Sequence, residues 1–143
     1  MKTSESFRIR LADWENDQPA LREIREQVFV IEQSVPHEME WDEFDSASRH
    51  VLAEAGGRTI GTGRLLPDGH IGRMAVLPEW REQGVGSALL QTLLDLARAA
   101  GHERAILNAQ VQAMPFYRRF GFVADGAEYL EAGIPHVAMS RRL

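Results

Sequence analysis

The chain has 143 residues, no cysteine and a formal net charge of −5. This length fits one domain, large enough to bury a core without disulfides or metal ions. The absence of cysteine excludes a disulfide scaffold, a cysteine nucleophile and a thiolate zinc site. The negative charge argues against general nucleic-acid binding, and no apolar run reaches the roughly 20 residues of a membrane span. Residues 1–14 lack the apolar centre of a signal peptide, so we expect a cytoplasmic protein.

In the first third of the chain, one predicted strand is followed by one predicted helix. Residues Phe7–Leu11 alternate between apolar and polar side chains, as a half-buried strand does. Apolar residues then recur at helical spacing, which predicts a helix over Pro19–Gln33. These residues are Leu21, Ile24, Val28 and Ile31. Pro36 ends that helix, and the overlapping segment 32–45 is acidic and irregular.

Three strands joined by two turns are predicted next. Arg49–Ala55 and Thr59–Leu66 flank Gly56-Gly57, a pair typical of hairpin turns. A second turn, Pro67–Gly69, leads into the run Ile71–Leu77. This run is apolar on both faces, so we expect it to be a central strand.

The second half of the chain alternates predicted helices and strands. A long helix ends at Gly101, which supplies a C-cap, and a short helix closes at Gly121. The elements are the helix Ala88–Ala100, the strand Arg104–Gln110, the short helix Ala113–Phe120, and the final strands Phe122–Ala124 and His136–Ser140, which we expect to pair. The complete order predicts a single α/β or α+β domain whose central sheet is mixed, mostly antiparallel and flanked by helices.

The most specific motif is the loop between the central strand and the long helix. Its residues are Arg81, Glu82, Gln83, Gly84, Val85, Gly86 and Ser87. Two glycines let the backbone approach a ligand closely, and a helix start leaves N–H groups that suit a phosphate or diphosphate. We therefore expect the loop to bind a phosphorylated ligand. A dinucleotide fold fits less well, because Leu89 occupies the place of a third glycine or alanine.

With these motifs the chain resembles the GNAT acyltransferases, which transfer an acyl group from coenzyme A to an amine. Arg81-x-x-Gly84-x-Gly86 matches the family pattern of Gln or Arg, two residues, Gly, one residue, and Gly or Ala. A second stretch, Ala113-x-x-Phe116-Tyr117-x-x-x-Gly121-Phe122, is similar to the coenzyme-binding helix and turn of the family. The order of elements extends the resemblance over nearly the whole chain, which implies a GNAT-like single domain over residues 1–143.

Two further stretches resemble one bacterial subgroup, and one position departs from the family. Residues 28–33 and 133–139 are similar to the subgroup often called ElaA-like, whose acceptor substrates are poorly defined. Many family members carry asparagine seven residues before the tyrosine, where this chain has Gln110, and Asn108 lies two residues earlier.

The resemblance implies acetyl-CoA as the cosubstrate and indicates which residues hold it. The glycine loop is expected to bind the diphosphate through backbone N–H groups, and the splayed end of the central strand to pair with the pantetheine arm. The N–H of Val76 is expected to stabilise the oxyanion of the tetrahedral intermediate. Besides the loop, the expected coenzyme contacts are Met74, Ala75, Val76, Asn108, Phe116, Tyr117 and Arg119. No metal is expected, because the spacing of acids and histidines matches neither an EF-hand nor a zinc motif.

Catalysis requires one group that protonates the leaving thiolate and another that accepts a proton from the amine. The matched motif makes Tyr117 the candidate acid. Glu32 is the first candidate base, since burial beside an apolar helix face is expected to raise its pKa. The remaining candidates for the base are His37, Glu40, Asp42, Asp45 and His136.

The acidic segment 32–45 also bears on the acceptor substrate. It contains six acids and no lysine or arginine, which is expected to attract a cationic amine. A solvated charged face explains the same composition equally well. Edge strands near the C-terminus indicate a homodimer as a further expectation.

The sequence therefore predicts an N-acetyltransferase in which a primary amine attacks the thioester directly within a ternary complex. Two alternatives stay open at this point. One is a catalytically idle module that binds acyl-CoA but lacks a working base. The other is a partner-binding domain without coenzyme.

Overall fold

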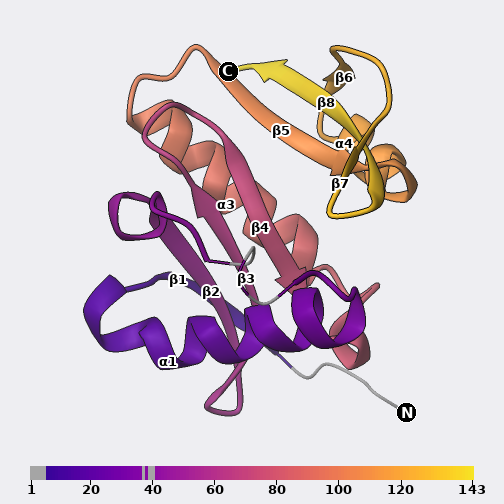
Figure 1. The fold of residues 1–143 in the computed structure, drawn as a ribbon. Coiled ribbons are helices and arrows are strands. Elements are labelled where there is room, and N and C mark those ends of the chain that lie inside the picture. Colours follow the sequence, from indigo (N-terminus) through magenta and orange to yellow (C-terminus); the bar gives the residue numbers. More distant parts are fainter. Residues whose placement is uncertain (1–5, 37, 39–40) are drawn as a thin grey trace.

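The computed structural model describes residues 6–36, 38 and 41–143. Its centre is a β-sheet in two parts with helices on both faces (Figure 1). Four antiparallel strands in the order β1-β2-β3-β4 form the first part. Their bounds are Arg8–Leu11, Arg49–Ala55, Arg58–Leu65 and Ile71–Val76. The predicted hairpin and the predicted strand that follows it are thereby confirmed, and this strand, β4, is the last one of the first part.

The second part of the sheet is built around the long strand β8. It consists of β5 (Arg104–Gln110), β6 (Val123–Ala124), β7 (Tyr129–Glu131) and β8 (Ile134–Arg142), and the other three strands all pair with β8. The predicted pairing of the last two strands is confirmed, with Val123 opposite Ser140. The strand β7 was not predicted, and its residues lie between the two predicted final strands.

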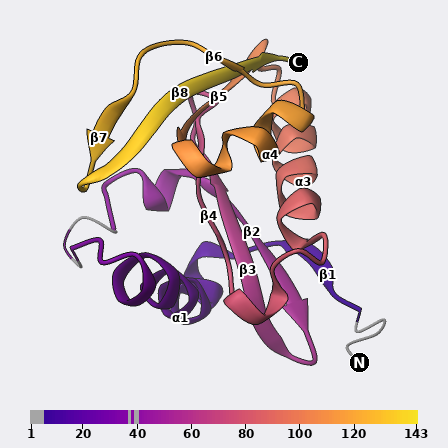
Figure 2. The same cartoon turned by 90° about the vertical axis from the view of Figure 1, so that its right-hand side faces the viewer.

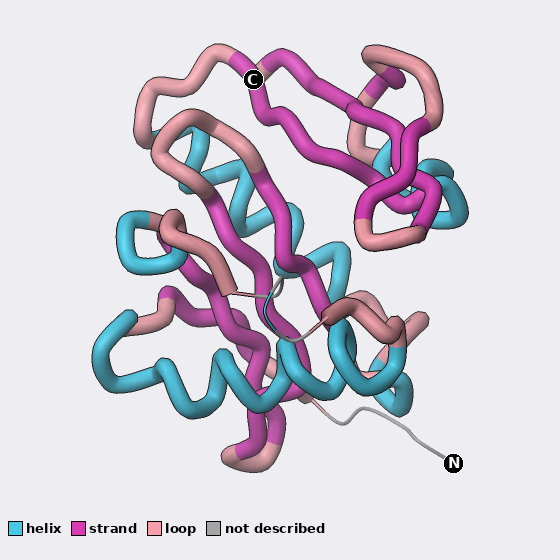
Figure 3. Tube along the Cα trace, in the orientation of Figure 1, coloured by secondary structure: helices cyan, strands magenta, loops and turns pink. Residues whose placement is uncertain are grey.

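The two parts meet at one point and then diverge. An isolated parallel bridge joins His70 to Ile106, and the N–H of Ile106 donates to the carbonyl oxygen of Gly69 at 3.2 Å. Beyond this bridge β4 and β5 separate, and the tube in Figure 3 shows the opening between them. The splay that the family resemblance implies is therefore present in the structure.

Helices cover both faces of the sheet. The helix α1 (Trp14–Arg25) continues into a π-helical segment, Glu26–Glu32, on one face. The helices α3 (Val85–Ala99) and α4 (Met114–Arg119) lie on the other face (Figure 2). Short 3-10 turns span Asp45–Ala47, Pro78–Trp80 and Val111–Ala113. No helix in the described part of the chain is long and apolar enough to cross a membrane.

The first helix begins earlier than predicted. Its N-cap is Asp13, whose carboxylate accepts from the N–H of Glu15 at 3.1 Å, whereas the sequence placed the start at Pro19. A proline in the first turn is common, but here Pro19 lies inside the helix. The aspartate cap therefore fixes the helix start at Trp14.

The π-helical segment alters which side chains face the core. The N–H of Gln33 donates to the carbonyl oxygen of Val28, five residues earlier, at 3.1 Å. This wider turn rotates the following side chains away from the α-helical pattern. Leu21, Ile24 and Val28 are buried as their spacing predicts, but Ile31 is 71% exposed.

Glycines in β3 let α3 approach the sheet closely. A Cβ atom on Gly63 would lie 2.7 Å from Cδ1 of Leu93, nearer than side chains pack. Leu89, Leu90, Leu93 and Leu94 of α3 are fully buried against the sheet. Because each buried leucine contributes about 1.5–3 kcal/mol, this contact is a major part of the stability of the domain.

Candidate active site

A bulge bends β4 where the two sheets begin to separate. Arg64 is paired with Gly72 and Thr62 with Ala75, so two residues of β4, Arg73 and Met74, face the single Gly63 of β3. Arg73 has a φ of 48°, a left-handed conformation that non-glycine residues rarely adopt. The bulge increases the local twist and turns the end of β4 away from β5.

The end of β4 directs backbone groups away from β3, into the opening. The N–H of Leu77 donates to the carbonyl oxygen of Ile60 in β3 at 2.9 Å. Since backbone groups alternate along a strand, those of Val76 point away from β3, towards the open edge. The carbonyl oxygen of Val76 accepts from Nε of Arg81 at 3.0 Å on this side. The N–H of Val76 therefore lies where an oxyanion donor is expected.

The glycine loop presents the start of α3 without a side-chain cap. Gly84 is the N-cap residue, and its φ of 86° requires the left-handed conformation that glycine adopts without strain. A Cβ atom on Gly84 would meet nothing within 4 Å, so the space beside the loop is open. The first N–H groups of α3 face this space with the positive end of the helix dipole. The arrangement fits a coenzyme diphosphate.

The two motifs that carry the resemblance lie against each other. A Cβ atom on Gly86 would be 3.7 Å from the ring of Phe116 and 4.0 Å from Cγ2 of Val76. The guanidinium of Arg119 is 5.8 Å from the centre of the Phe116 ring. The loop, the short helix and the end of β4 are therefore brought together, although they are far apart in sequence.

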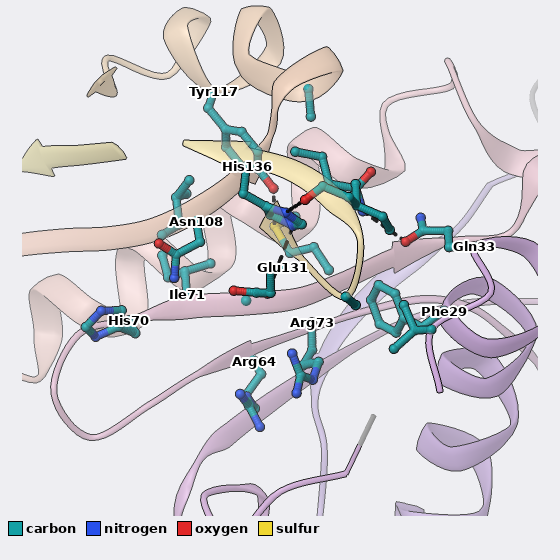
Figure 4. A pocket seen from close by; sticks show the side chains of 18 of the residues that line it. Phe29, Gln33, Arg64, His70, Ile71, Arg73, Asn108, Tyr117, Glu131 and His136 are labelled. Carbon is teal, nitrogen blue, oxygen red and sulfur yellow. Dashed lines mark hydrogen bonds and ion pairs between the residues drawn. The ribbon is translucent and has the colours of Figure 1, made fainter. Parts of the chain in front are cut away.

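A cavity of 520 Å³ lies in the opening between the two sheets, and three of the predicted coenzyme contacts line it: Met74, Asn108 and Tyr117. Figure 4 shows Tyr117 entering the cavity from α4. Its hydroxyl donates to Sδ of Met74 at 3.8 Å, and burial raises the pKa of Tyr117 to about 12. The phenol therefore keeps its proton throughout the neutral range.

Glu32 differs from expectation. Its carboxylate binds both terminal nitrogens of Arg81 at 2.6 Å, and the two side chains are 37% and 39% exposed. The hydrogen bonds from Arg81 lower the pKa of Glu32, so the expectation that burial raises it is wrong. The base role predicted for Glu32 stays a prediction, and a lowered pKa argues against it.

Arginines from other elements also pair with Asp42 and Asp45 of the acidic segment. Asp45 is buried and accepts from Nη1 of Arg25 at 2.8 Å and from Nη1 of Arg64 at 2.9 Å. Asp42 accepts from Arg64 at 2.8 Å and from Arg73 at 3.4 Å. Burial on its own raises the pKa of the Asp45 carboxyl, but the hydrogen bond from Arg25, with those from the Asp42 amide and Arg64, holds it below its usual value.

The cavity wall also differs from the predicted acidic lining. Side chains from residues 29–45 that line it are Phe29, Gln33 and Val35, and no described acid of the segment does so. Arg64 and Arg73 line the cavity instead, at the bottom of the view in Figure 4. His37 and Glu40, two of the candidate bases, lie outside the described residues.

Sequence reasoning missed part of the polar wall. The side chain of Gln110 donates to that of Gln33 at 2.9 Å, which joins β5 to the helix across the cavity mouth. Glu131 of β7 also lines the cavity, beside His136 of β8. Gln110 and His136 are directly opposite in the β5–β8 ladder, so their side chains project from the same face. Such cross-strand pairs appear only once the register is known.

The family model described as "Acetyltransferase (GNAT) domain" matches residues 12–143. The chain belongs to the GNAT family of acetyltransferases. It is 42% identical over 122 residues to the uncharacterized N-acetyltransferase YjcF of Bacillus subtilis, which covers 82% of this chain and 87% of YjcF. It is 30% identical over 132 residues to the protein ElaA of Escherichia coli, covering 87% and 86% of the two chains.

Solved structures of this GNAT family agree with the fold described above. The crystal structure of Escherichia coli ElaA has a TM-score of 0.86 at 27% identity and covers 95% of this chain and 99% of its own. An acyl-CoA N-acyltransferase from Pseudomonas aeruginosa has a TM-score of 0.85 at 32% identity, with the same coverage of 95% and 99%. The predicted fold class and the predicted similarity to ElaA are both confirmed. Among the described residues, no group of three or more acids and histidines is arranged as metal ligands.

Proposed function

We propose that this GNAT acetyltransferase transfers an acetyl group from acetyl-CoA to a primary amine by direct attack in a ternary complex. The observation that carries the proposal is the meeting of three features at the splayed edge of β4: the uncapped start of α3, the open backbone of Val76 and the buried phenol of Tyr117. They match the three parts of the thioester substrate: diphosphate, carbonyl oxygen and sulfur.

Each feature has a role in this proposal. The loop Arg81–Ser87 binds the diphosphate, with Phe116 and Arg119 beside it, and Met74, Ala75 and Asn108 contact the pantetheine and acetyl end. The N–H of Val76 stabilises the oxyanion when the amine adds to the carbonyl carbon. Tyr117 protonates the sulfur as the carbon–sulfur bond breaks.

The acceptor in this proposal is a primary amine with no requirement for extra positive charge. The cationic preference predicted from the acidic segment loses its support, because Asp42 and Asp45 are paired with arginines and Arg64 and Arg73 line the cavity. The cytoplasmic location and the homodimer stay predictions from the sequence.

Two measurements test the proposal. Calorimetry with coenzyme A should detect binding to the purified chain, and acetyl-CoA with a panel of amines should release free thiol. Because the chain has no cysteine, every thiol detected comes from the coenzyme. Binding without turnover on any amine would favour the idle module, and no binding at all would contradict the coenzyme site.

A further inference from the structure

His136 is a buried histidine whose side chain faces the cavity from the strand next to β5. The residue is 7% exposed and lines the same cavity as Tyr117. In Figure 4 the ring of His136 and the hydroxyl of Tyr117 point into the same part of this cavity. Gln110, directly opposite in the β-ladder, is hydrogen-bonded to Gln33, the residue that follows the π-helical segment. His136 therefore lies on the wall that an acceptor entering beside that helix would meet.

One hydrogen bond fixes which nitrogen of this ring is basic. Nδ1 of His136 is 2.7 Å from the carbonyl oxygen of Ile134, and a carbonyl oxygen only accepts, so Nδ1 carries the hydrogen. In the neutral ring the lone pair is then on Nε2. Nε2 lies 4.0 Å from an oxygen of the Glu131 carboxylate, which therefore lies beside the nitrogen that carries the lone pair.

We propose that His136 is the general base that takes a proton from the acceptor amine, and that Glu131 is a positioning residue for it. This inference rests on the transferase function proposed above. It replaces Glu32, whose carboxylate is held by Arg81 outside the set of residues that line the cavity.

The proton balance of the reaction fits this assignment. The acceptor nitrogen enters with three protons and leaves as an amide with one. Nε2 of His136 takes the first proton, and the freed lone pair forms the carbon–nitrogen bond as the carbonyl π pair moves onto oxygen. When this pair re-forms the carbonyl, the carbon–sulfur bond breaks and its electron pair leaves on sulfur. The sulfur takes the hydroxyl proton of Tyr117, and the tyrosinate regains a proton from the nitrogen through water. His136 returns its proton to solvent, so one proton is released per turnover.

Two substitutions separate the two nitrogens of the ring. In H136N the side-chain amide nitrogen occupies the place of Nδ1 and keeps the hydrogen bond to the carbonyl oxygen of Ile134. In H136Q the side-chain amide occupies the place of Nε2. Neither amide is basic at neutral pH. Both variants are expected to bind coenzyme A as the wild type does in calorimetry. With acetyl-CoA and a lysine-like amine, both are expected to lose about 10²–10³-fold in kcat/KM at pH 7.

The pH profile distinguishes a base from a structural residue. Without a base, only the neutral amine reacts, so kcat/KM of the variants should rise tenfold per pH unit up to the amine pKa of ~10.4. The wild type should instead level off, and its advantage should fall below about tenfold near pH 10. The groups that face His136 in this range are Glu131 and Tyr129 of β7, Tyr117, and, across the cavity, His70, Arg64 and Arg73. The E131Q variant should lower kcat/KM but keep the plateau of the wild-type profile, because the basic nitrogen of His136 is still present.

The outcomes of this experiment are distinct. H102Q is the matched control, since His102 lies in the turn after α3 and does not line the cavity, and it should keep the wild-type profile. Wild-type protein that releases no thiol with any amine contradicts the proposed function itself. If the wild type is active but H136Q shows no loss of kcat/KM, or the same loss at every pH, only the role of His136 is contradicted.

Discussion

The carboxylate of Glu32 and the guanidinium of Arg81 are joined by two hydrogen bonds of 2.6 Å each. The first residue ends the π-helical segment and the second begins the glycine loop, and Arg81 also donates to the carbonyl oxygen of Val76. The pair therefore ties the first helix to the edge of β4 where we place the coenzyme. A diphosphate that binds here competes with Glu32 for the same guanidinium.

The E32Q variant is therefore expected to bind coenzyme A about two- to fivefold more tightly than the wild type, because an exposed ion pair of this kind is worth at most about 1 kcal/mol. Calorimetry measures the effect, which should shrink at high salt. Arg81 lowers the pKa of Glu32, so the carboxylate stays charged and the difference should persist from pH 5 to 8. E43Q, which removes an exposed acid from the same segment, is the control. Weaker binding by E32Q would contradict the competition.

Gly84 provides a second prediction through its left-handed backbone. Alanine there costs about 1–2 kcal/mol of strain and places a methyl group beside the uncapped start of α3. G57A serves as the matched variant, because Gly57 has a φ of 76° in the hairpin turn and also has open space around it. Both variants should lower the free energy of unfolding by a similar amount, measured with urea. Only G84A should weaken coenzyme binding, and equal affinities in the two variants would argue against a diphosphate at this loop.

Tyr117 provides the third prediction. Y117F keeps the ring that packs against Phe122 and Phe116 but loses the hydroxyl, so the melting temperature and coenzyme affinity should change little. Turnover should fall by about 10²-fold, because the thiolate then leaves without its proton donor. Burial raises the pKa of Tyr117 to about 12, and an acid must be protonated to act, so ionisation of this residue should cause no loss of kcat below about pH 11. A wild-type turnover in Y117F would remove the acid role.

The buried Asp45 provides a prediction about stability. D45N leaves Arg25, which is 0% exposed, and Arg64 without their shared carboxylate, and breaking such a pair costs about 3–5 kcal/mol. The pKa of Asp45 is lowered in the folded state, so its contribution is present above the unfolded pKa of ~3.9 and is lost as pH falls through the folded value. The free energy of unfolding measured with urea should therefore fall more steeply at acid pH for the wild type than for D45N. Parallel pH profiles for the two proteins would contradict this account.

Periodicity in the sequence predicted the elements whose signals are local. The alternation in Phe7–Leu11, the hairpin at Gly56-Gly57 and the leucine stripe of α3 all correspond to observed elements. The predicted start of the first helix was wrong, because Asp13 caps a helix that begins at Trp14, five residues before Pro19. Ile31 was also predicted on the buried face of the helix and is exposed, because the spacing of apolar residues does not indicate a π-helical turn.

The site was harder to predict, because its geometry depends on pairs that are distant in sequence. The glycine loop could be identified from adjacent residues, and the resemblance extended this to the splay of β4. In contrast, Glu32 and Arg81 are 49 residues apart and Gln33 and Gln110 are 77 apart. Glu32, Asp42 and Asp45 appeared unpaired in the sequence because their arginine partners lie on other elements. Charge pattern alone therefore misjudged the lining of the cavity.

Because the edge of β4 is open, hydrogen exchange at the backbone amide of Val76 can report whether a thioester is bound. Within the described residues, β4 pairs along its length with β3 only, and the N–H of Val76 is directed to the other side. Without ligand, this hydrogen should exchange rapidly with deuterium from the solvent, whereas the neighbouring Leu77 amide, bonded to Ile60, should be protected. Slowing of exchange at Val76 on addition of a thioester would reveal the position of its carbonyl without a crystal.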